Sequence, residues 1–363
     1  MMNPELTRYL KESEESILSL YQNKPPFPLS PKELHEGSFV YFERGGKRLR
    51  PAICRLTAGI CGGDEAEKAA DPCALTLELY HNWTLIHDDM IDHDDLRRGK
   101  KAVHKLISDR FTERYGKKTA DEYGTDVALL AGDALHSASV SYLAQLSDSG
   151  FVPPAVSLKI ISLLEGHFGP RLISGETLDT RNGLLYGAGA FYRLEKEEIL
   201  EMMWGKTAAL FGISALSGAL IGLRDPDESA PLAAALTRFA EHCGIAFQLQ
   251  DDILGITSTK ETLGKPIGSD IREGKPTLLL LSSYRNASPA EQEFLRSTVG
   301  ISKEEDEICR AMEIVRRRGG IEETRRVAAE FLSKAEEDLA LVPDSHRKKL
   351  LQSWQGFMVD RNL

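Results

Sequence analysis

The sequence LIHDDMIDHDDLRRGK, residues 85–100, contains five aspartates followed by two arginines and a lysine. Residues 74–86, upstream of it, are rich in apolar side chains and contain neither glycine nor proline, so we expect a helix that leads into the aspartates. In such a helix Asp88 and Asp92 share one face, with Asp89 beside them, and their like charges repel. The motif is therefore either a solvated acidic helix end or a site for a hard cation, Mg²⁺ or Ca²⁺.

A second aspartate pair favours the metal. Asp251 and Asp252 lie in FQLQDDILG, residues 247–255, and also end an apolar run, which starts at Phe239. If the two helices face each other, their carboxylates converge. Mg²⁺ usually binds only one or two protein carboxylates and completes its octahedron with water and substrate phosphate. Two aspartate groups without histidine or cysteine ligands therefore predict Mg²⁺ ions that hold a polyphosphate ester.

The composition is that of an ordinary globular protein. The chain has 363 residues, 42% hydrophobic and 28% charged, and we expect a single domain over residues 1–363. A net charge of −10 argues against a nucleic-acid-binding protein. Five cysteines without CxxC spacing fit reduced thiols rather than disulfides or a zinc site. Residues 1–23 lack the apolar centre of a signal peptide, so we expect a cytoplasmic protein.

Residues 207–223 could be mistaken for a membrane span. They carry no charge, and Gly218 and Gly222 have GxxxG spacing. However, 17 residues are at the lower limit for crossing a bilayer, and the segment is rich in glycine, serine and alanine. We therefore expect a helix buried on all sides and no transmembrane segment.

Other local signals predict further helices and the turns between them. Ser30, Pro31 and Glu33 form the pattern of a capping box, which predicts a helix that runs toward Phe42. We expect interruptions at residues 62–64, 105–126, 166–169, 183–189 and 257–274. We expect helices at residues 127–146, 155–164, 170–179, 277–285, 289–297, 303–318, 321–339 and 345–358. No segment alternates in the way that predicts a β-strand.

The segment GGKRLRP, residues 45–51, combines a glycine pair with three cations. Glycine lets backbone approach an anion closely, and arginine binds diphosphate oxygens through two N–H groups. The segment is thus either a diphosphate-binding turn or a solvated basic connection between helices. Likewise, the lysines of residues 257–274 belong either to a lid over a charged ligand or to an ordinary solvated surface.

The motifs occur in a characteristic order. They are GGKRLRP, DDMID followed by LRRGK and VH, AGDAL, KT, FQLQDD and GKPIGSDIREGK. Together they resemble the trans-type polyprenyl diphosphate synthases, most of all the geranylgeranyl and farnesyl diphosphate synthases, over roughly residues 39–278. The resemblance implies an all-α domain of ten or more helices around a deep central cavity, and a homodimer.

The resemblance also implies an activity, a head-to-tail condensation of isopentenyl diphosphate with an allylic diphosphate. Asp88, Asp92 and Asp251 would hold three Mg²⁺ ions on the allylic diphosphate. The other implied roles are binding of the allylic diphosphate by Arg97, Lys206 and Lys265, binding of isopentenyl diphosphate by Lys47, Arg50, His81 and Arg98, and catalysis by Lys206 and by the oxygens of Thr207 and Gln248 near the allylic cation. Lys275 is a further substrate-binding candidate.

The length of the product is implied by two aromatic residues. Trp83 and Tyr80 lie five and eight positions before Asp88. In the family, an aromatic residue at the first of these positions, with no insertion in the aspartate motif, accompanies products of about C20, and the size of tryptophan leaves C15 open. The alternative is that Trp83 is a core residue, since large aromatic residues are usually buried for packing.

Two positions depart from the pattern of the family. Gly255 stands where many relatives have a third aspartate, which leaves Asp251 as the main ligand of the second motif. Glu176, in GETLD, stands where glutamine is usual, and its carboxylate would alter the surroundings of the metal.

Three alternatives remain. A terpene cyclase of the same fold needs no isopentenyl site, so GGKRLRP and Arg98 count against it. A non-catalytic subunit that regulates a synthase would tend to have lost aspartates that are present here. A structural calcium-binding helix pair is disfavoured because such ligands usually lie in a glycine-bearing loop.

Overall fold

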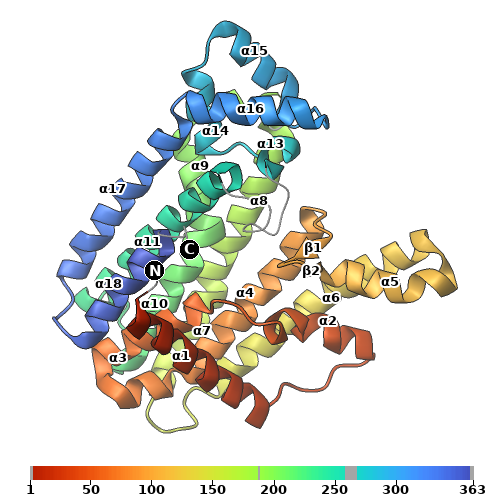
Figure 1. The fold of residues 1–363 in the computed structure, drawn as a ribbon. Coiled ribbons are helices and arrows are strands. Elements are labelled where there is room, and N and C mark those ends of the chain that lie inside the picture. The colour runs from red at the N-terminus through yellow and green to blue at the C-terminus, as the bar shows by residue number, and fades with distance from the viewer. Residues whose placement is uncertain (1–2, 187–188, 258–267, 360–363) are drawn as a thin grey trace.

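The computed structural model describes residues 3–186, 189–257 and 268–359, and most of them lie in helices (Figure 1). The first half of the chain forms α1 (Pro4–Asn23), α2 (Lys32–Glu43), α3 (Leu49–Ala69), α4 (Asp71–Ile91), α5 (Val103–Tyr115), α6 (Lys117–Ala144), α7 (Pro154–Leu163) and α8 (Gly169–Tyr186). The second half forms α9 (Lys196–Met203), α10 (Ala209–Leu223), α11 (Pro231–Thr257), α13 (Ser269–Glu273), α14 (Leu278–Arg285), α15 (Pro289–Thr298), α16 (Glu305–Arg317), α17 (Gly320–Ala340) and α18 (His346–Val359). The prediction of an all-α fold with ten or more helices is confirmed.

Helix α10 forms the centre of the bundle. Residues 209–222 are all buried, and the helix packs against α3 on one side and α11 on another (Figure 1). Two stretches, Lys117–Ala144 and Lys196–Leu223, are long and apolar enough to cross a membrane, but 89% of the apolar window of the second is buried in the protein. A core helix meets the same criteria of length and composition. The expectation of a buried helix is confirmed for α10.

Glycines allow α3 and α10 to pack closely. A Cβ atom on Gly218 would lie 2.0 Å from the backbone oxygen of Cys54 and 2.2 Å from Oγ1 of Thr57. A Cβ atom on Gly222 would lie 2.5 Å from the backbone oxygen of Ala58. The GxxxG spacing therefore serves packing between two helices of this chain.

Two π-helical turns each join one α-helix directly to the next. The predicted interruption at residues 166–169 is wrong, because the π-helical turn η1 (Leu164–Phe168) carries α7 directly into α8. A second turn, η3 (Trp204–Ala208), joins α9 to α10 and contains Lys206 and Thr207. Such turns insert one extra residue into a helix and are frequent at functional sites.

The predicted loop over residues 105–126 is also wrong. This segment belongs to α5 and α6, which are separated only by Gly116, whose φ is 79°. Its charges lie mainly on solvent-exposed helix surface, so a high charge content did not indicate a loop. The capping box at Ser30 does not form, because α2 starts at Lys32 with Pro31 as N-cap and no side-chain cap.

The remaining boundaries agree closely with expectation. Helices α14 to α18 start and end within two residues of the predicted positions, and Gly63, with φ of 76°, kinks α3 as expected. Residues 183–186, predicted as loop, continue α8. Most of the predicted loop at 257–274 lies outside the described residues, and its last part contains α13.

One small β-structure was not predicted. Strands β1 (Leu96–Arg97) and β2 (Lys100–Lys101) pair in an antiparallel hairpin directly after α4. Arg98 and Gly99 form its turn with φ of 52° and 71°, as in a type I′ turn, whose two central residues both have positive φ. Two residues per strand are too few for an alternating pattern to be visible in the sequence.

The packing of α3 against α10 predicts the effect of one substitution. Gly218→Ala should lower the free energy of unfolding by about 1–3 kcal/mol, because the new methyl group meets backbone and must displace a helix. Thermal and urea unfolding followed by circular dichroism measure this. Gly356→Ala in α18 is the control: a Cβ atom there has no neighbour within 4 Å, so stability should be equal or higher. An equal loss in both variants would contradict the packing argument.

Candidate active site

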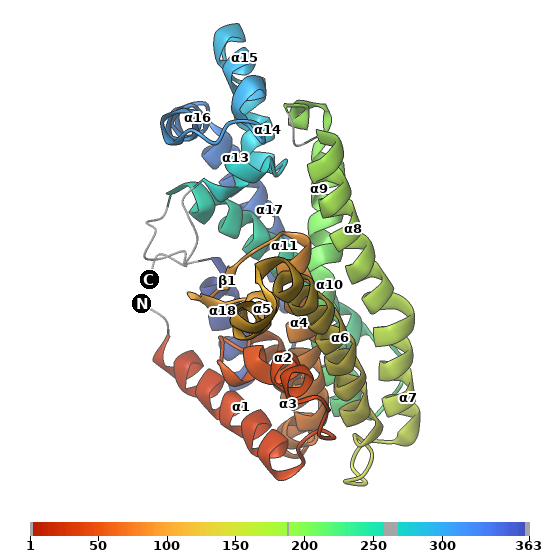
Figure 2. The same ribbon diagram turned by 90° about the vertical axis from the view of Figure 1, so that its right-hand side faces the viewer.

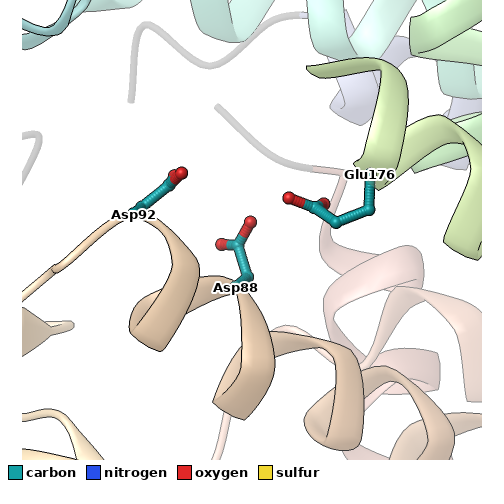
Figure 3. Close-up of side chains that lie close together, drawn as sticks. All are labelled: Asp88, Asp92 and Glu176. Atoms are coloured by element: carbon teal, nitrogen blue, oxygen red, sulfur yellow. The ribbon is translucent and has the colours of Figure 1, made fainter. Parts of the chain in front are cut away.

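The end of α4 places Asp88 and Asp92 beside a glutamate of α8. One oxygen from each of Asp88, Asp92 and Glu176 lies within 4.8 Å of the other two, and the three carboxylates point toward one another (Figure 3). Asp88 lies in the last turn of α4, and Asp92 is its C-cap residue. The predicted common face of Asp88 and Asp92 is therefore present, and α8 adds a third carboxylate to it.

Lys206 pairs with Asp88 and Glu176 and also with Asp179. Its Nζ lies 3.0 Å from Oδ1 of Asp88, 3.0 Å from Oε2 of Glu176 and 2.6 Å from Oδ2 of Asp179. Burial would lower the pKa of Lys206, but the three negative charges outweigh it and raise that pKa well above its usual value. Lys206 is thus fully charged and joins the turn η3 to α4 and α8.

The approach of η3 to α8 depends on two glycines. A Cβ atom on Gly175 would lie 2.1 Å from the backbone nitrogen of Lys206, and one on Gly205 would lie 2.9 Å from Cα of Gly175. The backbones are therefore in direct contact, which brings Glu176 within reach of Lys206. The glycine of GETLD and the glycine before Lys206 serve this contact.

Arg97, in the β-hairpin, is held against the aspartate motif. Its Nη2 donates to Oδ2 of Asp88 at 2.8 Å, and its Nε donates to Oδ1 of Asp89 at 2.7 Å. Asp89 is buried and also accepts a hydrogen bond from the hydroxyl of Tyr41. Burial favours the neutral form of Asp88, but Lys206 and Arg97 outweigh it and lower the pKa of Asp88 to about 2. Asp89 therefore positions Arg97, and Asp88 stays ionised.

Lys275 approaches from the segment that follows α13. Its Nζ lies 2.7 Å from Oδ2 of Asp92, 183 positions away in the sequence. Burial would lower the pKa of Lys275, but the charges of Asp92 and Asp179 raise it. This contact places Lys275, the last residue of the GKPIGSDIREGK motif, at the site. Lys265, the other lysine predicted there, lies outside the described residues.

The second aspartate motif forms a separate group at the end of α11. Thr207 donates to Oε1 of Gln248 at 2.9 Å, and Gln248 in turn donates to Oδ1 of Asp252 at 3.2 Å. Thr207 and Gln248, two of the predicted site residues, therefore lie beside each other. Asp251 is half-buried and does not belong to the tight group around Asp88 found among the described residues. A Cβ atom on Gly255 would lie 3.3 Å from Oδ2 of Asp270, so Gly255 leaves room for that carboxylate.

Two of the predicted cationic residues, Arg50 and Arg98, lie near His81. Loss of hydration around the half-buried His81 ring, together with the charges of Arg50 and Arg98, lowers the pKa of His81 well below its usual value. Arg98 donates to the backbone oxygen of Gly45. Lys47 lies 5.0 Å above the ring of Phe357. The structure thus brings the predicted binding residues Arg50, His81 and Arg98 together.

Arg48 has a different environment from its neighbours. Its side chain is buried, its Nε lies 2.9 Å from Oε1 of Glu14, and its Nη1 lies 3.1 Å from Oε1 of Glu78. It also donates to the backbone oxygen of Phe42. Of the three cations in GGKRLRP, Arg48 holds the helices together, and it leaves Lys47 and Arg50 as ligand-binding candidates.

A cleft of about 440 Å³ lies between α4 and α8, directly below the carboxylates. Its lining includes Trp83 and Asp88 of α4 and Leu172, Ile173 and Glu176 of α8. Behind Trp83, the rings of Tyr80 and His136 have their centres 4.8 Å and 4.7 Å from its own. Trp83 therefore lines the cleft, and Tyr80 is buried behind it.

Sequence reasoning missed several residues at this site. Tyr41, Asp179 and His136 contact Asp89, Lys206 and Trp83, respectively. Asp179 had a local signal, because it ends the GETLD motif. Tyr41 and His136 have no distinctive neighbours in the sequence, and only the fold brings them to the site.

The fold and the site define a class of protein. Asp88 and Glu176, which are paired with lysine and arginine side chains, line a largely apolar cleft, and this combination suits a magnesium-bound phosphate ester with an apolar tail. The family model of polyprenyl synthetase matches residues 31–315. The chain belongs to the polyprenyl synthetase family.

Individual relatives match along almost the whole chain. The short chain isoprenyl diphosphate synthase of Methanothermobacter thermautotrophicus is 33% identical over 358 residues, which cover 98% of this chain and 97% of the relative. The geranylgeranyl pyrophosphate synthetase of Pyrococcus horikoshii has a TM-score of 0.82 at 29% identity and covers 98% of both chains. A polyprenyl synthase from Caulobacter crescentus, solved with calcium and isoprenyl diphosphate, has a TM-score of 0.80 at 27% identity and covers 99% of this chain and 97% of that one.

The crowding of carboxylates predicts a pH-dependent stability. Burial raises the pKa of Glu176 to about 7, although Lys206 opposes the shift. A carboxyl with a raised folded-state pKa stabilises the fold at low pH, and this contribution is lost as the pH rises from 4.5 through 7. Glu176→Gln, which mimics the neutral form, should therefore raise the free energy of unfolding at pH 8 by up to about 3 kcal/mol and have almost no effect at pH 5.

Thermal unfolding of both proteins at pH 5 and pH 8, in a chelator that removes divalent ions, measures this difference. The same stabilisation at both pH values would show that Glu176 is not the group that titrates.

Proposed function

We propose that this protein is a Mg²⁺-dependent prenyltransferase that condenses isopentenyl diphosphate with an allylic diphosphate to give a short-chain product of about C20, with C15 as the alternative. The observation that carries the proposal is the cleft between α4 and α8, which is lined by Asp88, Glu176 and apolar side chains, with Lys206 in contact with both carboxylates. Such a site has one end for a metal-bound diphosphate and another for a hydrocarbon chain.

The residues at the mouth suit magnesium. All the donors of the group around Asp88 are carboxylate oxygens, the ligands that Mg²⁺ prefers. We propose that Asp88, Asp92 and Asp251 hold three ions together with the allylic diphosphate. When bound, these ions neutralise the charge that develops on the departing diphosphate.

The cations have a second task during departure of the diphosphate. Arg97, Lys206 and Lys275 now bind aspartates, but each has N–H groups that a diphosphate oxygen can share, and Lys265 would join them. These fixed charges stabilise the leaving group most strongly as its charge increases, so they lower the barrier rather than only binding substrate.

The other substrate binds at the basic group. Lys47, Arg50, His81 and Arg98 would hold isopentenyl diphosphate, with arginine N–H groups paired to its oxygens. The carbon–oxygen bond to the diphosphate breaks and leaves an allylic cation, the double bond of isopentenyl diphosphate then attacks the cationic carbon, and the released diphosphate takes up the proton that the new chain loses. The oxygens of Thr207 and Gln248, 2.9 Å apart, would stabilise the allylic cation.

The exposed surface supports the proposal of a homodimer. Helices α6, α7 and α8 lie on one side of the molecule in Figure 2, and each carries exposed large apolar side chains, namely Leu129, Leu130, Leu158, Ile173 and Leu184. A monomer seldom exposes so many, and a second copy of the chain would cover them. We also propose that the chain acts as a single cytoplasmic domain.

The alternatives are less well supported. A terpene cyclase would leave the basic group around His81 without a diphosphate to bind. A regulatory subunit would have no need for Asp88, Asp92, Lys206 and Arg97 in mutual contact. The presence of both groups favours a catalytic prenyltransferase.

Asp88→Asn tests the proposal for the metal. Loss of this charge should reduce turnover with Mg²⁺, isopentenyl diphosphate and an allylic starter by at least a hundredfold, since it removes a metal ligand and a partner of Lys206. Circular dichroism should show a folded protein. Asp109→Asn, which removes an exposed aspartate paired with Lys101, should keep normal turnover. Near-normal turnover of Asp88→Asn would exclude the metal assignment.

Substitutions at the floor of the cleft test the product length. Trp83→Ala should deepen the cleft and shift the products toward longer chains, and a smaller residue at Tyr80 should shift them further, because Tyr80 lies directly behind Trp83. Chromatography of the hydrolysed products measures chain length. Trp354→Phe, at a buried tryptophan that does not line the cleft, should leave it unchanged. Unchanged products of a well-folded double variant would place the stop elsewhere.

A further inference from the structure

The π-helical turn η3 carries two of the proposed catalytic residues, Lys206 and Thr207. In this turn the backbone N–H of Ala209 donates to the carbonyl oxygen of Trp204, which lies five residues earlier in the chain instead of the usual four. The extra residue of such a turn can lie at different places along a helix. Moving it would rotate the side chains in between by about 100°, the angle per residue of a helix. The directions of Lys206 and Thr207 therefore depend on the contacts that fix η3 at this place.

Trp204, the first residue of this turn, is held by side chains from two other helices. The guanidinium carbon of Arg171, on α8, lies 3.5 Å from the centre of the Trp204 ring. The indole N–H of Trp204 donates to the carboxylate of Glu241, on α11. Glu241 in turn lies against α10, because a Cβ atom on Gly212 would be 2.7 Å from Cγ of Glu241 and 2.8 Å from its Oε1. A cation on the face of the ring and a carboxylate at its N–H thus fix Trp204.

The carboxylate of Glu241 is costly where it lies. Loss of hydration around the half-buried side chain raises the pKa of Glu241 to about 7, although the hydrogen bond from Trp204 and the charges of Arg171 and Arg238 oppose this shift. The charge of Asp338 raises the pKa further. A carboxylate removed from water seldom adds stability compared with an apolar side chain of similar size, but it can select one arrangement of its neighbours. Here that arrangement is the one in which the indole N–H of Trp204 faces α11.

We propose that Glu241 is a positioning residue for the transfer reaction, because through Trp204 it fixes η3 and thereby directs Lys206 toward the carboxylates and Thr207 toward Gln248. This inference rests on the proposed function, which gives Lys206 and Thr207 their roles. Glu241 acts only through Trp204. The basic group proposed to bind isopentenyl diphosphate lies elsewhere, so binding of that substrate should not depend on Glu241.

Steady-state kinetics of the full-length protein with Mg²⁺, isopentenyl diphosphate and an allylic starter test this role. Glu241→Leu should reduce kcat by about tenfold or more, because the groups at the reacting bond are displaced, and should leave KM for isopentenyl diphosphate within about twofold of the wild type. Glu241→Gln, which keeps an acceptor oxygen, should retain most of kcat. Trp204→Phe removes the N–H and keeps a ring for Arg171, and it should lose as much of kcat as Glu241→Leu.

The double variant of Glu241→Leu and Trp204→Phe shows whether the two residues act together. If both substitutions break one contact, the double variant should be no slower than either single variant. The matched control is Asp338→Asn, which removes another buried carboxylate near Glu241 that pairs with Arg238 and His242. It should lower the melting temperature and leave kcat unchanged, which separates a loss of stability from a loss of positioning.

Several results would overturn the positioning role. They are a normal kcat in folded Glu241→Leu or Trp204→Phe, losses that multiply in the double variant, and a rise in KM for isopentenyl diphosphate without a change in kcat. Circular dichroism identifies the folded variants, and Trp204→Phe carries the test if Glu241→Leu does not fold. In each of these cases a wild type that forms product retains the proposed function. A wild type that forms no product would exclude the transferase and, with it, this role of Glu241.

Discussion

The structure of the site depends on the ion pairs between Lys206 and three carboxylates from two helices. Asp88 comes from α4, and Glu176 and Asp179 come from α8. Without a central cation these groups would repel and push the two helices apart, because Coulomb energies between half-buried charges reach several kcal/mol. The contact of Gly175 with the backbone of η3 allows Lys206 to reach all three. One lysine, and the backbone contact that supports it, therefore fix the positions of the carboxylates on α4 and α8.

Much of this could be predicted from sequence, because the signals were local. Apolar periodicity with aspartates at its end predicted α4 and its common face, and the uncharged run of 17 residues predicted the buried α10. These features depend on spacing along the chain, which a sequence displays directly.

Other features could not be predicted because they depend on contacts across the fold. A glycine before a proline normally indicates a break, yet at Gly169 the chain stays helical through η1. A Cβ atom at this position would lie 2.3 Å from the hydroxyl oxygen of Tyr80, so glycine leaves space for that side chain. Charge content misled at residues 105–126, because a charged sequence is equally typical of an exposed helix face.

The residues proposed to bind the metal and those proposed to limit the product length lie along the same helix, α4. Along α4, Trp83 and Tyr80 lie about 7.5 and 12 Å before Asp88 at the usual helical rise. The ring of His136 packs against both, and its Nε2 lies 3.0 Å from Oε2 of Glu165, so the floor is tied to α6 and η1. The carboxylates are tied instead to the hairpin, α8 and η3. Different neighbours therefore fix Trp83 and Tyr80 on the one hand and the carboxylates on the other. For this reason the size of the residues at positions 80 and 83 can change without moving the metal ligands. The length of the product can then vary while the condensation reaction stays the same.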